Sequence, residues 1–234
     1  MIDNDGGMSV DVDYTKYWRL RAFPFDNVPD PRFYVPCSQH DAAHRWLSYG
    51  VQTGKGLLLL TGDVGCGKTL LSRRLIVGLL PARYDVALVA NPALSPSELL
   101  DEVLSQFGLG RMRSKGRRLQ TLNERLQSNA QRGISSVLIV DEAQAIESAK
   151  GFEDLRLLTN FQLNDRFLLT ILLIGQPELR HRVAGIPQLN QRIAIRTHVG
   201  PFTAEETTSY IVARMESVSE RTDVFTKEAM AGIY

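Results

Sequence analysis

The chain has 234 residues, of which 44% are hydrophobic and 23% charged, and this composition is typical of a globular protein with a sizeable core. Its 27 Lys and Arg residues nearly balance 26 Asp and Glu residues, so the net charge of +1 argues against a protein that binds nucleic acid over its whole surface. Two cysteines exclude a disulfide framework and favour a reducing compartment. We find no signal peptide, and the apolar run at 167–175 is too short to span a membrane.

The chain begins with a polar, acidic stretch, and we expect residues 1–13 to be disordered. An irregular segment rich in proline and aromatic residues follows, and then a helix is predicted over 38–54. From there to residue 201, short apolar segments alternate with segments of helical spacing. We therefore expect a single α/β domain over 14–201.

Five strands are predicted in this domain, at 56–62, 85–91, 135–144, 167–175 and 193–201. Helices are predicted between them, at 68–80, 95–109, 119–133, 153–164 and 177–185. Strands this apolar are covered on both faces, which indicates a parallel, doubly wound sheet. The pattern becomes wholly helical over 202–234, and we expect there the beginning of a small helical lid, incomplete at Tyr234.

The segment "GDVGCGKT" lies between a buried strand and a helix and fits the pattern G-x-x-x-x-G-K-[ST]. Glycines let the backbone amides turn inward around an anion, and the start of the following helix adds positive charge. We predict a phosphate-binding loop that takes a nucleotide; Cys66 is then a small loop residue, with redox sensing as the alternative. The predicted nucleotide-binding residues are Gly62, Asp63, Val64, Gly65, Cys66, Gly67, Lys68, Thr69 and Leu70.

A second acidic motif, "VLIVDEAQ", ends the third predicted strand. Thr69 and Asp141 are the predicted Mg²⁺ ligands. Glu142 is placed to polarise an attacking water as a general base. The alternative is that the acidic pair only caps the next helix. The extra strand between this motif and the glycine-rich loop favours the class of P-loop proteins with a catalytic glutamate.

Three further residues are weaker candidates for the site. Gln176 directly follows the fourth predicted strand, so we expect its side chain to sense the γ-phosphate. Arg192 precedes the fifth strand and is the predicted arginine finger, which acts in a neighbouring subunit's site. Arg196 could take that role instead.

The segment "GRMRSKGRR", residues 110–118, is strongly basic. It predicts either contact with nucleic acid or an acidic partner, or a solvated loop between helices. The segment contains no aromatic residue on which bases could stack, which favours the solvated loop.

Several segments taken in order, among them "TGDVGCGKTLL", "VLIVDEAQ", "LRLLTNFQ" and "IGQPELR", resemble the general secretion pathway protein A family of AAA+ ATPases. Related groups include pilus-biogenesis ATPases and regulators of transposition. The resemblance implies a five-stranded parallel sheet of order 5-1-4-3-2. It also implies ATP with Mg²⁺ as the ligand, and a homo-oligomer whose ATP sites lie between subunits.

The favoured hypothesis is an ATPase that assembles or remodels a secretion or pilus-type machinery. We expect the protein in the cytoplasm. The resemblance also implies a location at the cytoplasmic face of the inner membrane, through segments absent from this chain. The alternatives are an ATP-dependent DNA-binding regulator and a nucleotide-gated scaffold with little hydrolysis.

Overall fold

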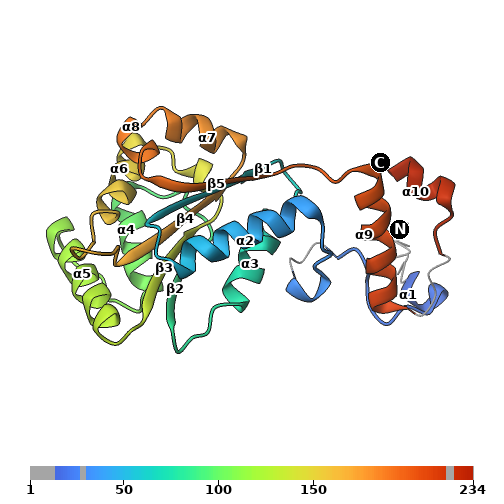
Figure 1. The fold of residues 1–234 in the computed structure, drawn as a ribbon, viewed down its shortest axis with the longest axis horizontal. Helices are drawn as coiled ribbons and strands as arrows, with labels where there is room; N and C mark the ends of the chain where they lie inside the picture. The colour runs from blue at the N-terminus through green and yellow to red at the C-terminus, as the bar shows by residue number, and fades with distance from the viewer. Residues whose placement is uncertain (1–13, 27–29, 220–223, 234) are drawn as a thin grey trace, which may run out of the picture. The chain divides into compact units, whose positions relative to one another are not determined.

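A parallel β-sheet organises the larger part of the chain (Figure 1). The computed structural model describes residues 14–26, 30–219 and 224–233, so the expected disorder of 1–13 lies outside the described residues. Within this part, the sheet consists of β1 (Leu57–Gly62), β2 (Tyr84–Val89), β3 (Ser135–Val140), β4 (Leu169–Gly175) and β5 (Ile193–Val199). Its order β2-β3-β4-β1-β5, with every pairing parallel, confirms the predicted order 5-1-4-3-2.

Helices cover both faces of this sheet, which is why its central strands are apolar throughout (Figure 1). Alternate residues of β1 point to opposite faces: Leu58 and Leu60 belong to one core cluster, and Leu57 and Leu59 to the other. The first cluster is completed by α2 (Ser38–Gln52) and α3 (Lys68–Val77). The second is completed by α4 (Pro96–Gln106), α5 (Lys115–Gln131), α6 (Ala149–Leu158), α7 (Pro177–Ala184) and α8 (Pro187–Asn190).

Two helices begin about four residues earlier than the sequence predicts. The Ser114 hydroxyl accepts a hydrogen bond from the Arg117 amide at 3.3 Å, so α5 takes in the end of the basic segment. Ser148 accepts from the Gly151 amide at 3.1 Å and begins α6 in the same way. Serine caps therefore set both starts, whereas the hydrophobic spacing marks only the buried turns.

The chain divides into two compact units, Pro29–Pro201 and a second unit that joins Met1–Val28 to Phe202–Tyr234. Of the described residues, 14–26 fall in the second unit, and the predicted domain bounds 14–201 and 202–234 stay predictions. The second unit contains α1 (Tyr14–Trp18), α9 (Ala204–Val218) and α10 (Lys227–Ile233). Within it, the Arg21 amide donates to the Val218 carbonyl at 2.8 Å. Contacts of this kind between distant segments leave no periodic signal in a sequence.

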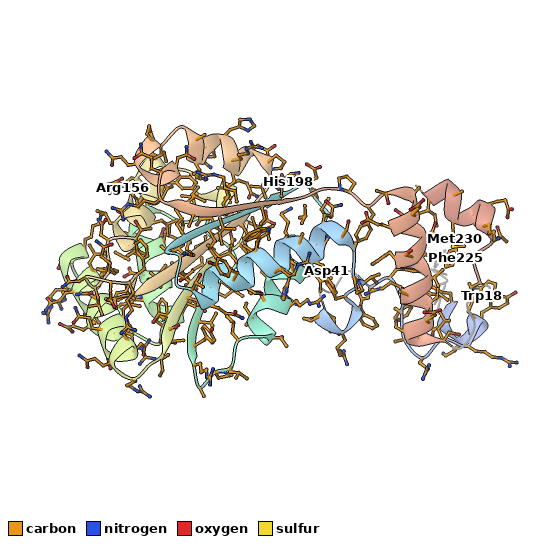
Figure 2. The ribbon with its side chains drawn as sticks, viewed as in Figure 1. Trp18, Asp41, Arg156, His198, Phe225 and Met230 are labelled. Carbon is orange, nitrogen blue, oxygen red and sulfur yellow. The ribbon has the colours of Figure 1, made fainter. Side chains whose placement is uncertain are left out.

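Figure 2 adds the side chains to this fold. Among the helices described, none is both long and apolar enough to cross a bilayer.

Candidate nucleotide-binding site

The glycine-rich loop connects the C-terminal end of β1 to the first residue of α3. Gly67 has φ of 74°, in the left-handed region that a residue with a Cβ adopts only at a cost. Gly62 is required for another reason, since a Cβ there would lie 2.3 Å from the Val199 carbonyl oxygen of β5. The loop is thus shaped both by its own backbone and by the neighbouring strand.

Lys68, the first residue of α3, is 6% exposed. Its ammonium donates a hydrogen bond to the Asp63 carbonyl oxygen at 2.7 Å, so the side chain folds back across the loop. A buried cation beside a glycine-rich loop is suited to a phosphate group.

Asp141 follows the last residue of β3 and brings the two sequence motifs together. The Thr69 hydroxyl donates to its Oδ2 at 3.0 Å, and the Glu142 amide donates to its Oδ1 at 2.9 Å. Burial raises the pKa of the Asp141 carboxyl, and the two hydrogen bonds and the Lys68 charge oppose this effect. Residues 72 positions apart in the sequence thus form one polar cluster.

The oxygen atoms of this cluster are of the kind that binds Mg²⁺. No group of three His, Cys, Asp or Glu side chains that could hold a metal occurs among the residues described. Mg²⁺ in nucleotide sites uses one or two protein oxygens and takes its other ligands from phosphates and water. A hydroxyl and a carboxylate held 3.0 Å apart are such a pair.

Glu142 has φ of 50°, a left-handed conformation that is rare for glutamate and often marks functional sites. Its carboxylate accepts a hydrogen bond from the side-chain amide of Gln144. The Gln144 Oε1 in turn accepts from the backbone amide of Gln176 at 3.1 Å. Gln144 therefore connects the predicted general base to the end of β4, a link that sequence reasoning missed.

The signal for Gln144 was present in the sequence, as the polar residue that ends "DEAQ". The backbone carbonyl oxygen of Gln144 accepts a hydrogen bond from the Arg182 guanidinium. The Nη2 of Arg182 also donates to the Glu147 backbone carbonyl at 3.1 Å. Helix α7 is thereby tied to the loop that follows the acidic motif.

Gln176 is the N-cap residue of α7 and lies between the ends of β1 and β3, since β4 pairs with both strands. Its described contact is made by the backbone, so the sensor role of its side chain stays a prediction.

The two candidate arginines lie away from the loop of their own chain. Arg192 precedes β5, whose first residue pairs with Leu57 at the start of β1. It donates to the Thr159 carbonyl at 3.1 Å. Arg196 donates to the Asn190 carbonyl at 2.6 Å. Both guanidiniums thus bind carbonyls at the C-terminal ends of helices in their own chain, and the choice between them stays open.

A buried histidine beneath the loop is a second feature that the sequence did not reveal. His40, on the first turn of α2, lies with Nε2 2.8 Å from the Cys66 carbonyl oxygen.

The thiol of Cys66 shows no sign of activation. Burial, together with the Asp63 charge, raises the pKa of the Cys66 thiol, which favours the neutral form and argues against redox sensing there.

The basic segment is partly paired in the structure. The Arg118 Nε lies 2.6 Å from Asp101 Oδ1, and Lys115 forms an ion pair with Asp154. Arg111 and Arg113 are exposed.

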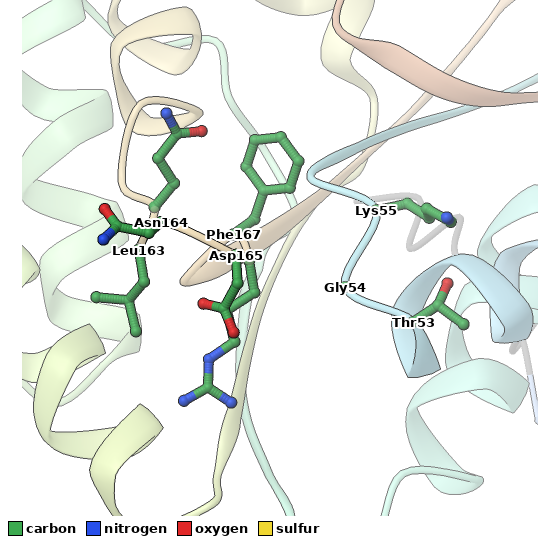
Figure 3. A pocket seen from close by; sticks show the side chains of 9 residues that line it. Thr53, Gly54, Lys55, Leu163, Asn164, Asp165 and Phe167 are labelled. Carbon is green, nitrogen blue, oxygen red and sulfur yellow. The ribbon is translucent and has the colours of Figure 1, made fainter.

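A cavity of about 690 Å³ lies at the N-terminal ends of the strands, opposite the glycine-rich loop. It is bordered by the segments that precede β1 and β4 (Figure 3). Lys55 borders it on one side and Asn164, Asp165 and Phe167 on the other (Figure 3). None of its lining residues is a predicted site residue, so it is separate from the nucleotide site.

Comparisons with known proteins agree with this geometry. Residues 51–183 match the family model of the AAA domain. General secretion pathway protein A of Aeromonas hydrophila is 35% identical over 225 residues, which make up 94% of this chain and 41% of that protein. This chain therefore spans less than half of its relative.

Two solved structures share the fold. The Aeropyrum pernix ORC2 protein in its ADPNP–ADP complexes has a TM-score of 0.63 and 18% identity, covering 87% of this chain and 57% of that one. Drosophila ORC bound to DNA has a TM-score of 0.64 and 19% identity, covering 86% and 50% respectively.

Proposed function

This chain belongs to the AAA domain family of P-loop ATPases and is related to general secretion pathway protein A, and from that premise we propose that it binds ATP with Mg²⁺ and hydrolyses it. The observation that carries the proposal is the hydrogen bond from Thr69 to Asp141, since it unites a hydroxyl of the glycine-rich loop with the carboxylate after β3. The relative and the family model together confirm the resemblance to the general secretion pathway protein A family that the sequence motifs indicated.

Each residue of the cluster has a role in this proposal. The loop amides and Lys68 hold the phosphates, and the start of α3 adds its positive end. Thr69 and Asp141 would hold Mg²⁺, which neutralises phosphate charge when it is bound. Glu142 orients a water molecule and accepts its proton as the water displaces ADP from the γ-phosphate. Gln176 contacts the γ-phosphate, and Arg192 of an adjacent subunit stabilises the transition state.

Binding and turnover in two variants test this assignment. Lys68→Ala should lose most of its affinity for a non-hydrolysable ATP analogue, because it removes the cation inside the loop. Glu142→Gln should bind the analogue normally and lose at least about a hundredfold in turnover, as expected when a general base is removed. Calorimetry and phosphate release measure the two effects. Unchanged affinity in the first variant, or near-normal turnover in the second, would remove the corresponding role.

At the cellular level we propose a homo-oligomer that assembles or remodels a secretion or pilus-type machinery. We propose that it acts in the cytoplasm, at the cytoplasmic face of the inner membrane. The relationship to general secretion pathway protein A over 94% of this chain supports the proposal. Co-purification with secretion components in an ATP-dependent manner would test it.

A DNA-binding regulator is the second candidate, favoured by the exposed Arg111 and Arg113 of the basic segment. Two other basic residues of this segment, Lys115 and Arg118, form ion pairs with acidic side chains, which reduces the positive charge available to a phosphate backbone. A gel shift at rising salt separates the candidates, because contacts to phosphates weaken steeply as salt increases.

A further inference from the structure

The first turn of α2 connects three separate parts of the α/β unit. The Gln39 side chain accepts from the Gly200 amide at 2.9 Å and donates to the Pro201 carbonyl at 3.0 Å. Asp41, labelled in Figure 2, accepts from the Tyr34 hydroxyl at 2.8 Å. Between them, His40 turns toward the glycine-rich loop. Each of three successive residues therefore holds a different segment.

His40 is 5% exposed, and each of its ring nitrogens has a partner. Nε2 lies 2.8 Å from the Cys66 carbonyl oxygen, and Nδ1 lies 2.7 Å from the Cys37 sulfur. A carbonyl oxygen only accepts hydrogen bonds, so Nε2 must carry a proton. In the neutral ring Nδ1 is then the acceptor, and the Cys37 thiol is its donor. The Cys66 carbonyl thus selects the tautomer, and the Cys37 thiol completes the hydrogen bonding of the ring.

The orientation of the Cys66 carbonyl also fixes the next amide. The peptide bond between Cys66 and Gly67 is planar and trans, as are the other described peptides, so its C=O and N–H point in opposite directions. With the carbonyl held toward His40, the Gly67 N–H points away from α2. The ring also packs against Gly67, since a Cβ at that residue would lie 3.5 Å from Nε2.

We propose that His40 is a positioning residue of the nucleotide site: it orients the Cys66–Gly67 peptide so that the Gly67 amide faces the phosphates. This inference rests on the proposed nucleotide binding. Gly67 is free to rotate about φ and ψ, and an unheld peptide samples orientations in which its amide is lost to the ligand. A buried donor that holds the carbonyl removes this freedom before the nucleotide arrives, and such preorganisation increases affinity.

Two amide variants of similar polarity separate this role from simple packing. The side-chain amide of glutamine can occupy the place of Nε2, whereas that of asparagine reaches only the place of Nδ1. His40→Asn should therefore bind a non-hydrolysable ATP analogue about tenfold more weakly, as expected for one lost hydrogen bond. His40→Gln should stay within about threefold of the wild type. Turnover at saturating ATP should be the same in both, since the loss lies in binding.

Gln39→Ala is the matched control, because it alters the same turn without touching the loop. Its affinity should also stay within about threefold of the wild type. Calorimetry measures affinity, and thermal unfolding reports whether each variant is folded. Normal binding by His40→Asn, or equal weakening in all three variants, would overturn the inference.

Cys37 offers a second route should His40→Asn fail to fold. Cys37→Ala removes the donor to Nδ1 and with it the contact that anchors the ring beneath the loop, so affinity should fall, whereas Cys37→Ser should retain it. Equal affinity in this pair would overturn the anchoring role of Cys37. Lys68→Ala distinguishes the two proposals: if it abolishes binding while His40→Asn binds normally, only the role of His40 fails. A wild-type protein that binds no analogue overturns both.

Discussion

At the scale of single residues, Asp141 shows a conflict between stability and the proposed function. The residue is 5% exposed, and burial raises the pKa of its carboxyl in the folded protein above the ordinary value. The folded state therefore binds the proton more tightly than the unfolded chain does. This group favours folding at low pH, and its contribution is lost as pH rises through the folded-state pKa. At neutral pH the site holds a charge that costs stability until a cation arrives.

Asp141→Asn should accordingly raise the melting temperature of the nucleotide-free protein at pH 8. The asparagine oxygen can still accept from the Glu142 amide, and its amide can donate to the Thr69 hydroxyl, so both hydrogen bonds have a substitute. We expect a gain of a few degrees, since about 1 kcal/mol corresponds to roughly 2–4 °C in a chain of this size.

The pH dependence of that gain is its control. It should shrink as pH falls toward the carboxyl's pKa, because the wild-type side chain is then neutral too. Melting curves from pH 8 to pH 5, with and without Mg²⁺ and ATP analogue, measure both effects. A variant that melts below the wild type at pH 8, or whose gain ignores pH, would contradict this account.

Gly175, the last residue of β4, reports on the link through Gln144. A Cβ at this residue would lie 2.4 Å from Gln144 Oε1 and 2.8 Å from Leu179 Cδ2. Gly175→Ala should therefore displace the Gln144 side chain and release the Glu142 carboxylate. We expect a loss of about 1–3 kcal/mol in unfolding free energy, typical of overpacking, and a fall in ATP turnover larger than the fall in ATP affinity.

Gly116→Ala is the matched control, because a Cβ there meets no heavy atom within 4 Å and the residue lies in the first turn of α5. It should leave turnover unchanged and stabilise the protein slightly, as alanine does in helices. Chemical denaturation and phosphate release measure both variants. Full turnover in Gly175→Ala would show that Gln144 does not position Glu142.

At the scale of elements, the basic segment divides into a structural part and an exposed part. The Arg118 side chain is 13% exposed and contacts both carboxylate oxygens of Asp101 on α4, at 2.6 and 2.9 Å. Arg118→Ala should therefore destabilise the protein by about 1–3 kcal/mol, as expected for a partly buried hydrogen bond to a charged group. Arg113→Ala should be neutral within about 0.5 kcal/mol.

Denaturation curves of these two variants measure stability, and gel shifts measure any DNA affinity. Under the DNA-binding alternative, Arg113→Ala weakens DNA binding without loss of stability. Equal stability of Arg118→Ala and wild type would show that the ion pair contributes little.

The elements also show how far the sequence alone could go. The strands and most helices were predictable because each buries a periodic or continuous apolar surface, as β1 does with Leu57 to Leu60. The proximity of Thr69 and Asp141 was predictable because the carboxyl ends of parallel strands lie together. Gln144 and His40 were not, since the bonds that place them at the site involve distant backbone groups, the Gln176 amide and the Cys66 carbonyl. The hydrogen bond between Arg21 and α9 was not predictable either, because it joins residues 197 positions apart.

At the scale of the whole molecule, the position of Arg192 separates it from its own nucleotide loop. It lies beside the start of β1, whereas the loop follows the other end of that strand. At roughly 3.3 Å per residue, the strand is about 17 Å long. A guanidinium at that distance cannot reach a phosphate in its own subunit, so any catalytic role requires a second copy of the chain.

Mixed oligomers test this requirement directly. Arg192→Ala and Glu142→Gln proteins should each lose most of their turnover when assayed alone. Mixed in equal amounts, they should recover part of it, because a site formed by Glu142 of one subunit and Arg192 of the other is complete. Recovery should rise with total protein concentration, since it depends on association.

The control is Arg196→Ala mixed with Glu142→Gln protein. Arg196→Ala also removes a guanidinium that bonds to the end of a helix, at Asn190, so it matches the structural cost of losing the bond of Arg192 to Thr159. Recovery in the Arg192→Ala mixture alone identifies Arg192 as the finger, and recovery in the Arg196→Ala mixture alone identifies Arg196. Mixtures that form oligomers yet show no recovery would mean that neither arginine acts across the interface, because complementation between defective sites requires a residue donated by the neighbour.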